Sequence, residues 1–250
     1  MRVNQRVKPA ADTYPRILAC GDSALSIELH DSINDTVNER VIALAQSFSS
    51  APVSGVDDVV PTYRSVMVTY DPVVIRGEAL RREIQQRLSM LPIGRQSSRR
   101  IIVPVLYGGD AGLDLDALAE MKGLRPEKII ELHASADYRV HMIGFAPGFA
   151  YLGGLPDILH TPRLAAPRQR VEAGSIGIGG QQASINSVAG PSGWRFIGRT
   201  PLRVFDPARP NPFLLMAGDI VRFHPISASQ ASEMDHAIAD GCQIVKVETS

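Results

Sequence analysis

The stretch "FAPGFAYLGGLP", residues Phe145 to Pro156, lies inside an uncharged segment that runs from Met142 to Pro156. It holds two prolines, three glycines and three aromatic residues. Proline and glycine exclude a stable helix here, and no charge keeps the segment in water. We therefore expect a shaped apolar wall, which faces either a small ligand or a partner protein.

The sequence around this stretch is rich in glycine, since eleven of the 21 glycines fall between His141 and Pro201. Short β-type runs such as "GSIGIGG" and "WRFIGRTPLRVF" are separated by glycine and proline, which is typical of a barrel or sandwich. We expect Met216 to Asp219 to form a hairpin turn. The tail from Ser227 onward predicts a helix and a last strand.

The first ninety residues alternate strand and helix patterns. "RILACGDSALSIEL" indicates two strands separated by a turn, and "SINDTVNERVIALAQSF" is an amphipathic helix with Asp31 or Ser32 as its N-cap. In "SVMVTY", Val66, Val68 and Tyr70 alternate as in a half-buried strand, and "GEALRREIQQRLSML" is a second helix. The order ββαββα predicts helices that cover one face of a largely antiparallel sheet.

Residues 92–100, "PIGRQSSRR", are polar, contain glycine and lack periodicity, so we place a linker there. We expect a small α+β domain over residues 1–91 and an all-β barrel domain over residues 101–250, with a helix and a strand at its C-terminal end. Two short helices joined at Gly123 have the spacing of a helix-turn-helix. The acidic residues of the second helix, however, disfavour contact with a phosphate backbone.

The composition excludes several classes of function. The chain carries 26 basic and 26 acidic residues, so charge does not favour nucleic acid or an anionic membrane. No run of about 18 apolar residues occurs, and we expect a cytoplasmic protein. Cys20 and Cys242 have no CxxC partner and are expected to be buried free thiols. The separations of His141, His160 and His224 do not fit a metal site, so we expect no metal.

Four long motifs occur in order: "HMIGFAPGFAYLGGLP", "TPRLAAPRQRVEAGSIGIGGQQ", "GPSGWRFIGRTPLRVFDP" and "AGDIVRFHPIS". With them the chain resembles the family that contains the B component of 5-oxoprolinase, the Kip inhibitor of a sporulation sensor kinase and allophanate hydrolase subunit 1. The N-terminal "GDSALSIEL" fits as well, so the resemblance covers nearly the whole chain. It implies an α+β N-terminal domain followed by a cyclophilin-like β-barrel.

The resemblance also implies an activity and partners. The chain would be a subunit of an ATP-dependent 5-oxoprolinase, which opens the lactam of 5-oxo-L-proline to L-glutamate, and would be inactive alone. Its partners would be a second carboxyltransferase-type subunit, similar to the C component of 5-oxoprolinase or the Kip antagonist, and a third lactam-utilisation subunit. The alternatives are an inhibitor of a sensor histidine kinase and a component of a urea or allophanate carboxyltransferase–hydrolase system.

ATP would be used by the assembled enzyme, with no cofactor bound covalently by this chain. No GxxxxGK[ST] phosphate loop is present, and "GIGGQQ" lacks the following helix that such a loop needs, so we interpret it as a tight turn. The family commonly continues this segment as "GGQTGIYP", whereas this chain has "GGQQASINS". If Gln182 to Ser187 touch the substrate, specificity or activity differs here.

Six residues are candidates for substrate binding. Arg163 and Arg168 lie in "TPRLAAPRQR", where prolines stiffen the backbone, and could clamp the carboxylate of oxoproline or an acyl phosphate. Alternatively, they pair with surface acids. Aromatic residues with a few convergent polar groups are typical of a ligand cleft. These criteria add the following residues: Phe149, Tyr151, Gln181 and Arg199. Trp194 packs either in the core or at an interface. His141, His160 and His224 are either structural residues or general bases, and we assign no catalytic residue.

Overall fold

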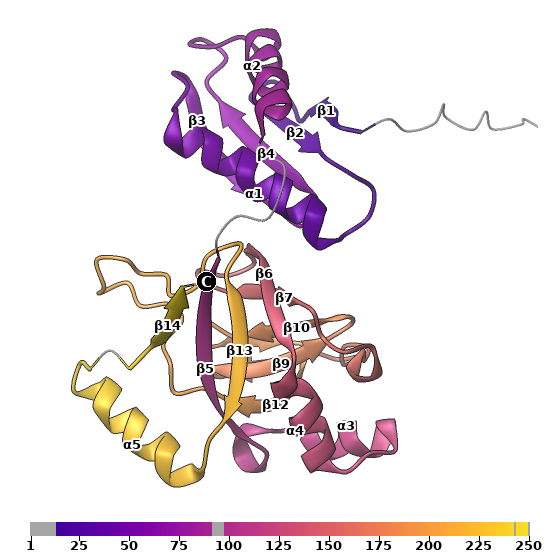
Figure 1. The fold of residues 1–250 in the computed structure, drawn as a ribbon, viewed down its shortest axis with the longest axis vertical. Helices are drawn as coiled ribbons and strands as arrows, with labels where there is room; N and C mark the ends of the chain where they lie inside the picture. The colour runs from indigo at the N-terminus through magenta and orange to yellow at the C-terminus, as the bar shows by residue number, and fades with distance from the viewer. Residues whose placement is uncertain (1–13, 92–97, 243, 250) are drawn as a thin grey trace, which may run out of the picture. The chain divides into compact units, whose positions relative to one another are not determined.

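The computed structural model describes residues 14–91, 98–242 and 244–249, and the chain divides into two compact units, residues 1–94 and 95–250 (Figure 1). Each unit contains its own apolar core. Of the expected linker, residues 92–97 lie outside the described residues. Its last two residues, Arg99 and Arg100, already belong to the first barrel strand, because their backbones pair with a neighbouring strand.

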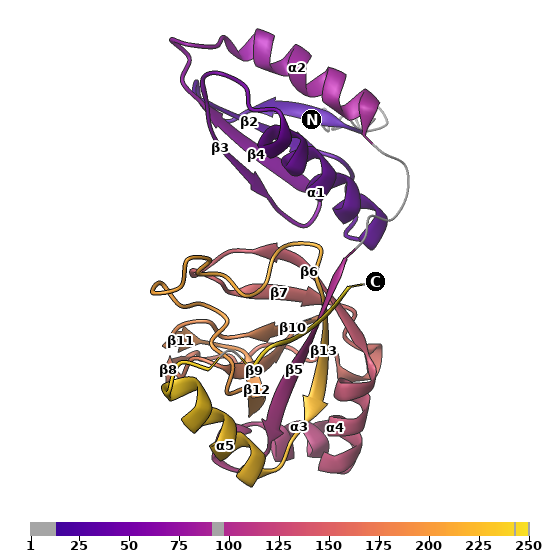
Figure 2. The same cartoon turned by 60° about the vertical axis from the view of Figure 1, so that its left-hand side comes forward.

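The first unit has the predicted order ββαββα. Its elements are β1 (Arg16–Ala19), β2 (Ala24–Glu28), α1 (Asp35–Ser50), β3 (Val56–Pro61), β4 (Ser65–Tyr70) and α2 (Gly77–Met90). The strands form an antiparallel sheet in the order β1-β2-β4-β3. Both helices contribute to one core with the same face of the sheet (Figure 2). On β4, Val66, Val68 and Tyr70 are buried as their alternation predicts.

Helix α1 begins later than the sequence pattern predicts. The N-cap is Asn34, whose Oδ1 accepts a hydrogen bond from the Val37 backbone N–H at 2.9 Å, and neither Asp31 nor Ser32 has this role. A side-chain acceptor at this position satisfies a backbone donor of the first turn that has no partner within the helix. Ile33 consequently stays outside the helix and is 54% exposed.

The second unit is built on a closed barrel. Its strands are β5 (Arg99–Tyr107), β6 (Asp137–Ile143), β7 (Ala150–Gly153), β8 (Arg168–Val171), β9 (Ser175–Gly179), β10 (Gln182–Ile185), β11 (Gly190–Ser192), β12 (Arg195–Arg199), β13 (Ile220–Pro225) and β14 (Lys246–Thr249). Seven of them follow the order β12-β9-β10-β7-β6-β13-β5, and pairing of β12 with β5 closes the barrel. The predicted α+β unit followed by a β-barrel is therefore confirmed.

Three further helices pack around this barrel. They are α3 (Leu115–Lys122), α4 (Pro126–Ser135) and α5 (Ala228–Ala239). Figures 1 and 2 show α3 and α4 at one end of the barrel, where Leu118 and Ile129 join its core. The two helices meet at Gly123, whose φ of 63° is accessible to glycine without a Cβ penalty. Strand β14 pairs with β5, so the tail strand belongs to the barrel unit.

Several local expectations are wrong. Met216 to Asp219 form a turn, with a 3.1 Å hydrogen bond from Asp219 N to Met216 O. No strand leads directly into this turn, because the preceding strand, β12, ends at Arg199. The turn is not a hairpin because β13 pairs with β5 in parallel and with β6. Cys20 and Cys242 are exposed rather than buried, since both lie outside the regular elements. No helix within the described ranges has the length and apolarity needed to cross a bilayer.

Candidate functional site

The same strands line two surfaces of the barrel wall. Strand residues alternate between the inside and the outside of a barrel. Ile176 and Ile178 of β9 lie in the inner core, whereas Gly177 and Gly179, which alternate with them, face outward. The outward side carries a second cluster, which we call the outer cluster. It consists of buried Phe149, Val171, Trp194 and Phe196, with partly buried Ala146 and Tyr151 packed against them.

Aromatic side chains dominate the outer cluster and meet mostly edge to face. The rings of Phe149 and Tyr151 are 4.9 Å apart at 70°, and those of Phe149 and Trp194 are 6.0 Å apart, also at 70°. Such arrangements add attraction beyond the buried area of the rings. Trp194 is 5% exposed and therefore belongs to a packed layer. The structure thus brings together the predicted residues Phe149 and Tyr151.

The glycines of "GSIGIGG" have two separate roles. Gly180 has a φ of 64°, as expected for the tight turn. Gly179 instead makes room for the tryptophan, because a Cβ there would lie 2.7 Å from Cδ2 of Trp194. A Cβ on Gly177 would lie 3.0 Å from a carbon of Phe196. The spacing of glycines on alternate strand positions is the signal that could have revealed an aromatic layer on this face.

Arg163 lies over the outer cluster. Its guanidinium carbon is 4.8 Å from the centroid of the Trp194 ring, which is a cation–π contact. Arg163 is exposed, and among the described residues no carboxylate forms an ion pair with it. The stacked cation therefore keeps its fork of N–H donors available for an anion from solution.

The other predicted arginines are already paired. Arg168 donates to both carboxylate oxygens of Asp114, at 2.9 and 2.7 Å, and Asp114 also accepts from the Phe196 backbone N–H at 2.7 Å. Asp114 is 5% exposed, so this ion pair joins β8 to the start of α3 from inside the fold. Arg199 makes a bidentate pair with Asp235 of α5, at 3.1 and 2.7 Å. Both guanidinium groups hold elements of the chain together.

The segment that departs from the family pattern lies directly beneath the outer cluster. Gln182 to Ile185 form β10, between β9 and β7. Ser184 is opposite both Gly177 and Tyr151, and its Oγ is buried without a hydrogen-bond partner among the described residues. The Ser187 hydroxyl is likewise buried without a hydrogen-bond partner among the described residues. Gln181, predicted to bind substrate, is exposed in the turn before β10.

Histidines of the barrel unit have structural surroundings. On β6, His141 packs over Gly153, where a Cβ would lie 2.2 Å from its Cε1. His160 Nε2 is 3.0 Å from the carbonyl oxygen of Leu155, and His224 is exposed. Within the described residues, no three side chains of His, Cys, Asp or Glu come together as a metal-binding group.

Sequence reasoning missed His133, which is fully buried in α4. Its ring stacks on Phe223 with centroids 4.5 Å apart, and its Nδ1 is 2.8 Å from the Tyr107 hydroxyl. Burial lowers the pKa of His133 from 6.5 to about 3, because the charged imidazolium would be desolvated. His133 is therefore neutral and enclosed in the core, away from any solvent-borne substrate. Its helical spacing from Ile129 is the only sequence signal that it faces inward.

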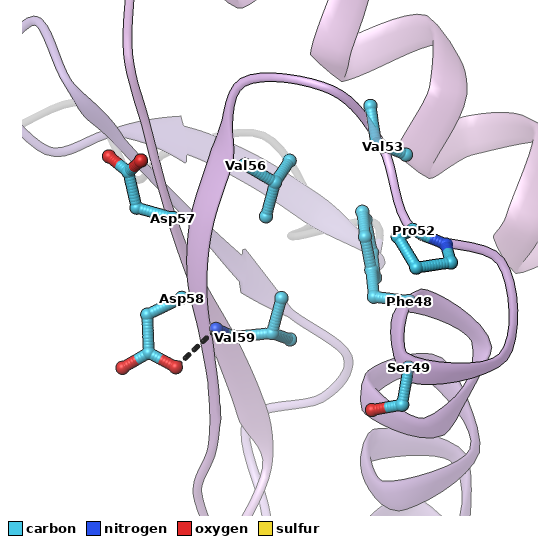
Figure 3. Close-up of a pocket in the computed structure, with 8 residues that line it drawn as sticks. All are labelled: Phe48, Ser49, Pro52, Val53, Val56, Asp57, Asp58 and Val59. Carbon is cyan, nitrogen blue, oxygen red and sulfur yellow. Dashed lines mark hydrogen bonds between the residues drawn. The ribbon is translucent and has the colours of Figure 1, made fainter.

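A pocket of about 220 Å³ lies in the first unit, between the end of α1 and β3 (Figure 3). Phe48, Val56 and Val59 line its apolar side. Figure 3 shows the carboxylates of Asp57 and Asp58 on the opposite side of the strand, a consequence of the β-bulge there. Ser49, Asp57 and Asp58 also line the pocket, which contains no residue predicted to bind substrate.

Comparison with known proteins gives a consistent assignment. The family described as carboxyltransferase domain, subdomain C and D, matches residues 15–215. The B subunit of 5-oxoprolinase from Bacillus subtilis is 39% identical over 218 residues, which cover 83% of this chain and 91% of the relative.

Two solved structures extend the comparison. The crystal structure of TTHA0988 superposes with a TM-score of 0.74 at 34% identity, covering 82% of this chain but only 40% of that one. The urea carboxylase of Kluyveromyces lactis gives a TM-score of 0.75 over 98% of this chain and 25% of its own, and at 19% identity it shows the fold alone. Because the family match spans residues 15–215 of this chain, the chain belongs to the carboxyltransferase domain family, subdomains C and D.

Proposed function

We propose that this chain is the B subunit of an ATP-dependent 5-oxoprolinase. The assembled enzyme would couple hydrolysis of ATP to ADP and phosphate with addition of water across the lactam C–N bond of 5-oxo-L-proline, releasing L-glutamate. The similarity to the Bacillus subtilis B subunit over 91% of that protein supports the assignment. The second carboxyltransferase-type subunit and a third lactam-utilisation subunit would complete the enzyme.

The substrate would bind at the outer cluster. The observation that carries this proposal is Arg163, an arginine stacked on Trp194 and not engaged by a carboxylate of the described residues. Its guanidinium can hold the carboxylate of oxoproline through two parallel hydrogen bonds. Tyr151, which is partly buried, would form the apolar wall beside the lactam ring, with the buried Phe149 packed behind it. Gln181, exposed at the turn before β10, would add a polar contact.

The chain would bind and orient the substrate, while its partner subunits supply ATP and proton transfer. His133 is neutral and enclosed, and His141 packs on the backbone of Gly153. Arg168 and Arg199, which we expected at the substrate, would instead act by holding β8 to α3 and β12 to α5. A shared active site of this kind explains why we expect the isolated chain to be inactive.

Reconstitution tests the proposal. The purified chain is mixed with the subunits encoded beside it, and L-glutamate release is followed with and without ATP and 5-oxo-L-proline. We expect release to require this chain, ATP and oxoproline together. Full release without the chain would contradict the proposal, and inhibition of sensor-kinase autophosphorylation by the chain would then support the regulatory alternative.

A further inference from the structure

Phe145 is an unusual residue on the surface of the barrel unit. Its φ is 67°, and it is the only non-glycine residue with positive φ in the described part of the chain. Its ring is 74% exposed. A phenylalanine in the left-handed region is uncommon because its Cβ crowds the backbone. Conformational strain and an exposed aromatic ring thus coincide at one position.

The surrounding loop holds Phe145 in this conformation through its backbone. Ala146 N donates to Gly144 O at 2.8 Å, which makes Phe145 the centre of a γ-turn of the rare positive-φ form. Phe149 N donates to Ala146 O at 3.0 Å around Pro147 and Gly148, and Gly148 has the φ of 74° that a type II turn requires.

The loop is fastened at its ends and along its side. Gly144 N donates to Phe149 O at 3.1 Å and closes the loop on itself. Gly148 abuts Phe205, since a Cβ on Gly148 would lie 2.8 Å from Cβ of Phe205. The ring of Phe145 meets that of Phe149 edge to face, with centroids 5.5 Å apart. These contacts hold the backbone of the loop, from which the side chain of Phe145 projects into solvent.

Glycine at residue 145 would adopt the positive φ without strain, and most of the Phe145 side chain is exposed, so packing within the isolated chain gives little reason for a phenylalanine there. A small-ligand site is concave and covers most of its ligand, whereas this ring protrudes from a turn. Protruding aromatic side chains that fill a pocket on a partner are typical anchors of protein interfaces. The geometry therefore favours a protein partner over a small molecule.

A longer solved relative carries this domain together with further polypeptide. The region matched in TTHA0988 makes up 40% of that chain, so further polypeptide is joined covalently to it there. We propose that Phe145 is a preorganised anchor that inserts into an apolar pocket of the second carboxyltransferase-type subunit. This inference rests on the proposed function, because it takes its partner from the assembled 5-oxoprolinase.

The test compares Phe145→Gly and Phe145→Ala with wild type, and uses Met121→Ala as a control. Met121 is an exposed apolar residue of α3, at 51% exposure. The purified full chain is titrated with the purified second subunit, and unfolding in urea is measured separately. We expect both Phe145 variants to bind about thirtyfold more weakly, as for an interface hot spot, and Met121→Ala to bind as wild type does.

The stability of the isolated chain provides the second readout. Phe145→Gly should unfold at an equal or higher urea concentration than wild type, because glycine adopts positive φ without strain. Weaker binding together with unreduced stability would support the anchor. A clear loss of stability would instead show that the ring holds the loop together and would overturn the inference.

The remaining outcomes separate this inference from the proposed function. Unchanged binding of both variants to the second subunit would overturn the anchor. If binding is unchanged while the KM for 5-oxo-L-proline rises, the ring belongs to the substrate site, and the proposed function stands without the anchor. If wild type neither binds the second subunit nor supports glutamate release, the proposed function itself fails.

Discussion

Strands β9 and β10 present two different surfaces on either side of one barrel wall. Inward, Ile176, Ile178 and Ile185 are fully buried in an aliphatic core. Outward, the same strands carry glycines and a serine under aromatic rings that meet mostly edge to face, with an arginine above them. The inner surface is what any barrel needs for stability. The outer surface contains groups that packing alone does not require, which is why we place function there.

Substitution on the inner surface should have the largest effect on stability. Ile178→Ala removes most of a fully buried side chain from the barrel core and should lower the free energy of unfolding by about 2–5 kcal/mol. The KM of the reconstituted enzyme for oxoproline should stay unchanged below the unfolding transition. Urea unfolding measures the loss of stability, and steady-state kinetics measure the KM. A rise in KM at full stability would break the distinction between the two surfaces.

Acid should also lower the stability of the chain, through the buried His133. The pKa of His133 is about 3 in the folded chain and 6.5 in the reference state, so the unfolded chain binds the proton more readily. Stability should therefore be complete above about pH 6.5 and fall as the pH drops toward 3. The loss approaches about 1.4 kcal/mol per pH unit. In urea unfolding between pH 7 and 4, His133→Gln should make the free energy of unfolding depend less on pH. If the variant loses stability with falling pH as steeply as wild type, other groups cause the loss.

The ion pair between Arg168 and Asp114 joins β8 to the start of α3, and its loss should have an intermediate effect on stability. Arg168→Ala leaves the buried Asp114 carboxylate without its cation and should cost about 2 kcal/mol of stability, reduced by the partial exposure of Arg168. The KM for oxoproline should change little at a temperature where the variant is folded. Undiminished stability with a raised KM would instead place Arg168 at the substrate, which is one of the two alternatives that the sequence left open.

Ser184 should give the smallest effect, with the opposite sign. Its hydroxyl is buried without a partner among the described residues, so Ser184→Ala should raise stability by up to about 1 kcal/mol. Thermal unfolding measures this change. A decrease in stability, or a loss of oxoproline affinity, would show that the hydroxyl has a partner in the working enzyme and that the departure from the family pattern sets specificity.

The fold was largely predictable because its signals are local. The alternation of Val66, Val68 and Tyr70 and the helical spacing of Leu80 and Ile84 are both read within a few residues, and both are confirmed. Strand β7 escaped notice because it is only four residues long, within a stretch of glycine and proline. Helix α1 was assigned the wrong cap because several residues before it can all accept a hydrogen bond.

The site was less predictable because its contacts join distant parts of the chain. The partner of Arg168 is Asp114, 54 residues earlier, and no periodicity links them. Gly179 makes room for Trp194, so the need for glycine there comes from a residue just before β12 rather than from its own turn. Arg163 was found from its residue type and its stiff segment. Its stacking on Trp194, however, depends on contacts between distant segments, such as the 2.7 Å hydrogen bond from Leu164 N to Gly193 O.

The central claim is that Arg163, on the outer surface, holds the substrate carboxylate, and one paired measurement tests it. Arg163→Gln is compared with Arg170→Gln, whose arginine lies on the same segment but is paired with Glu172. In the reconstituted enzyme, we expect Arg163→Gln to raise the KM for 5-oxo-L-proline at least about tenfold, with an unchanged unfolding midpoint, since a charge-assisted bidentate contact is lost. Arg170→Gln should leave the KM as in wild type. An unchanged KM in Arg163→Gln would contradict the account.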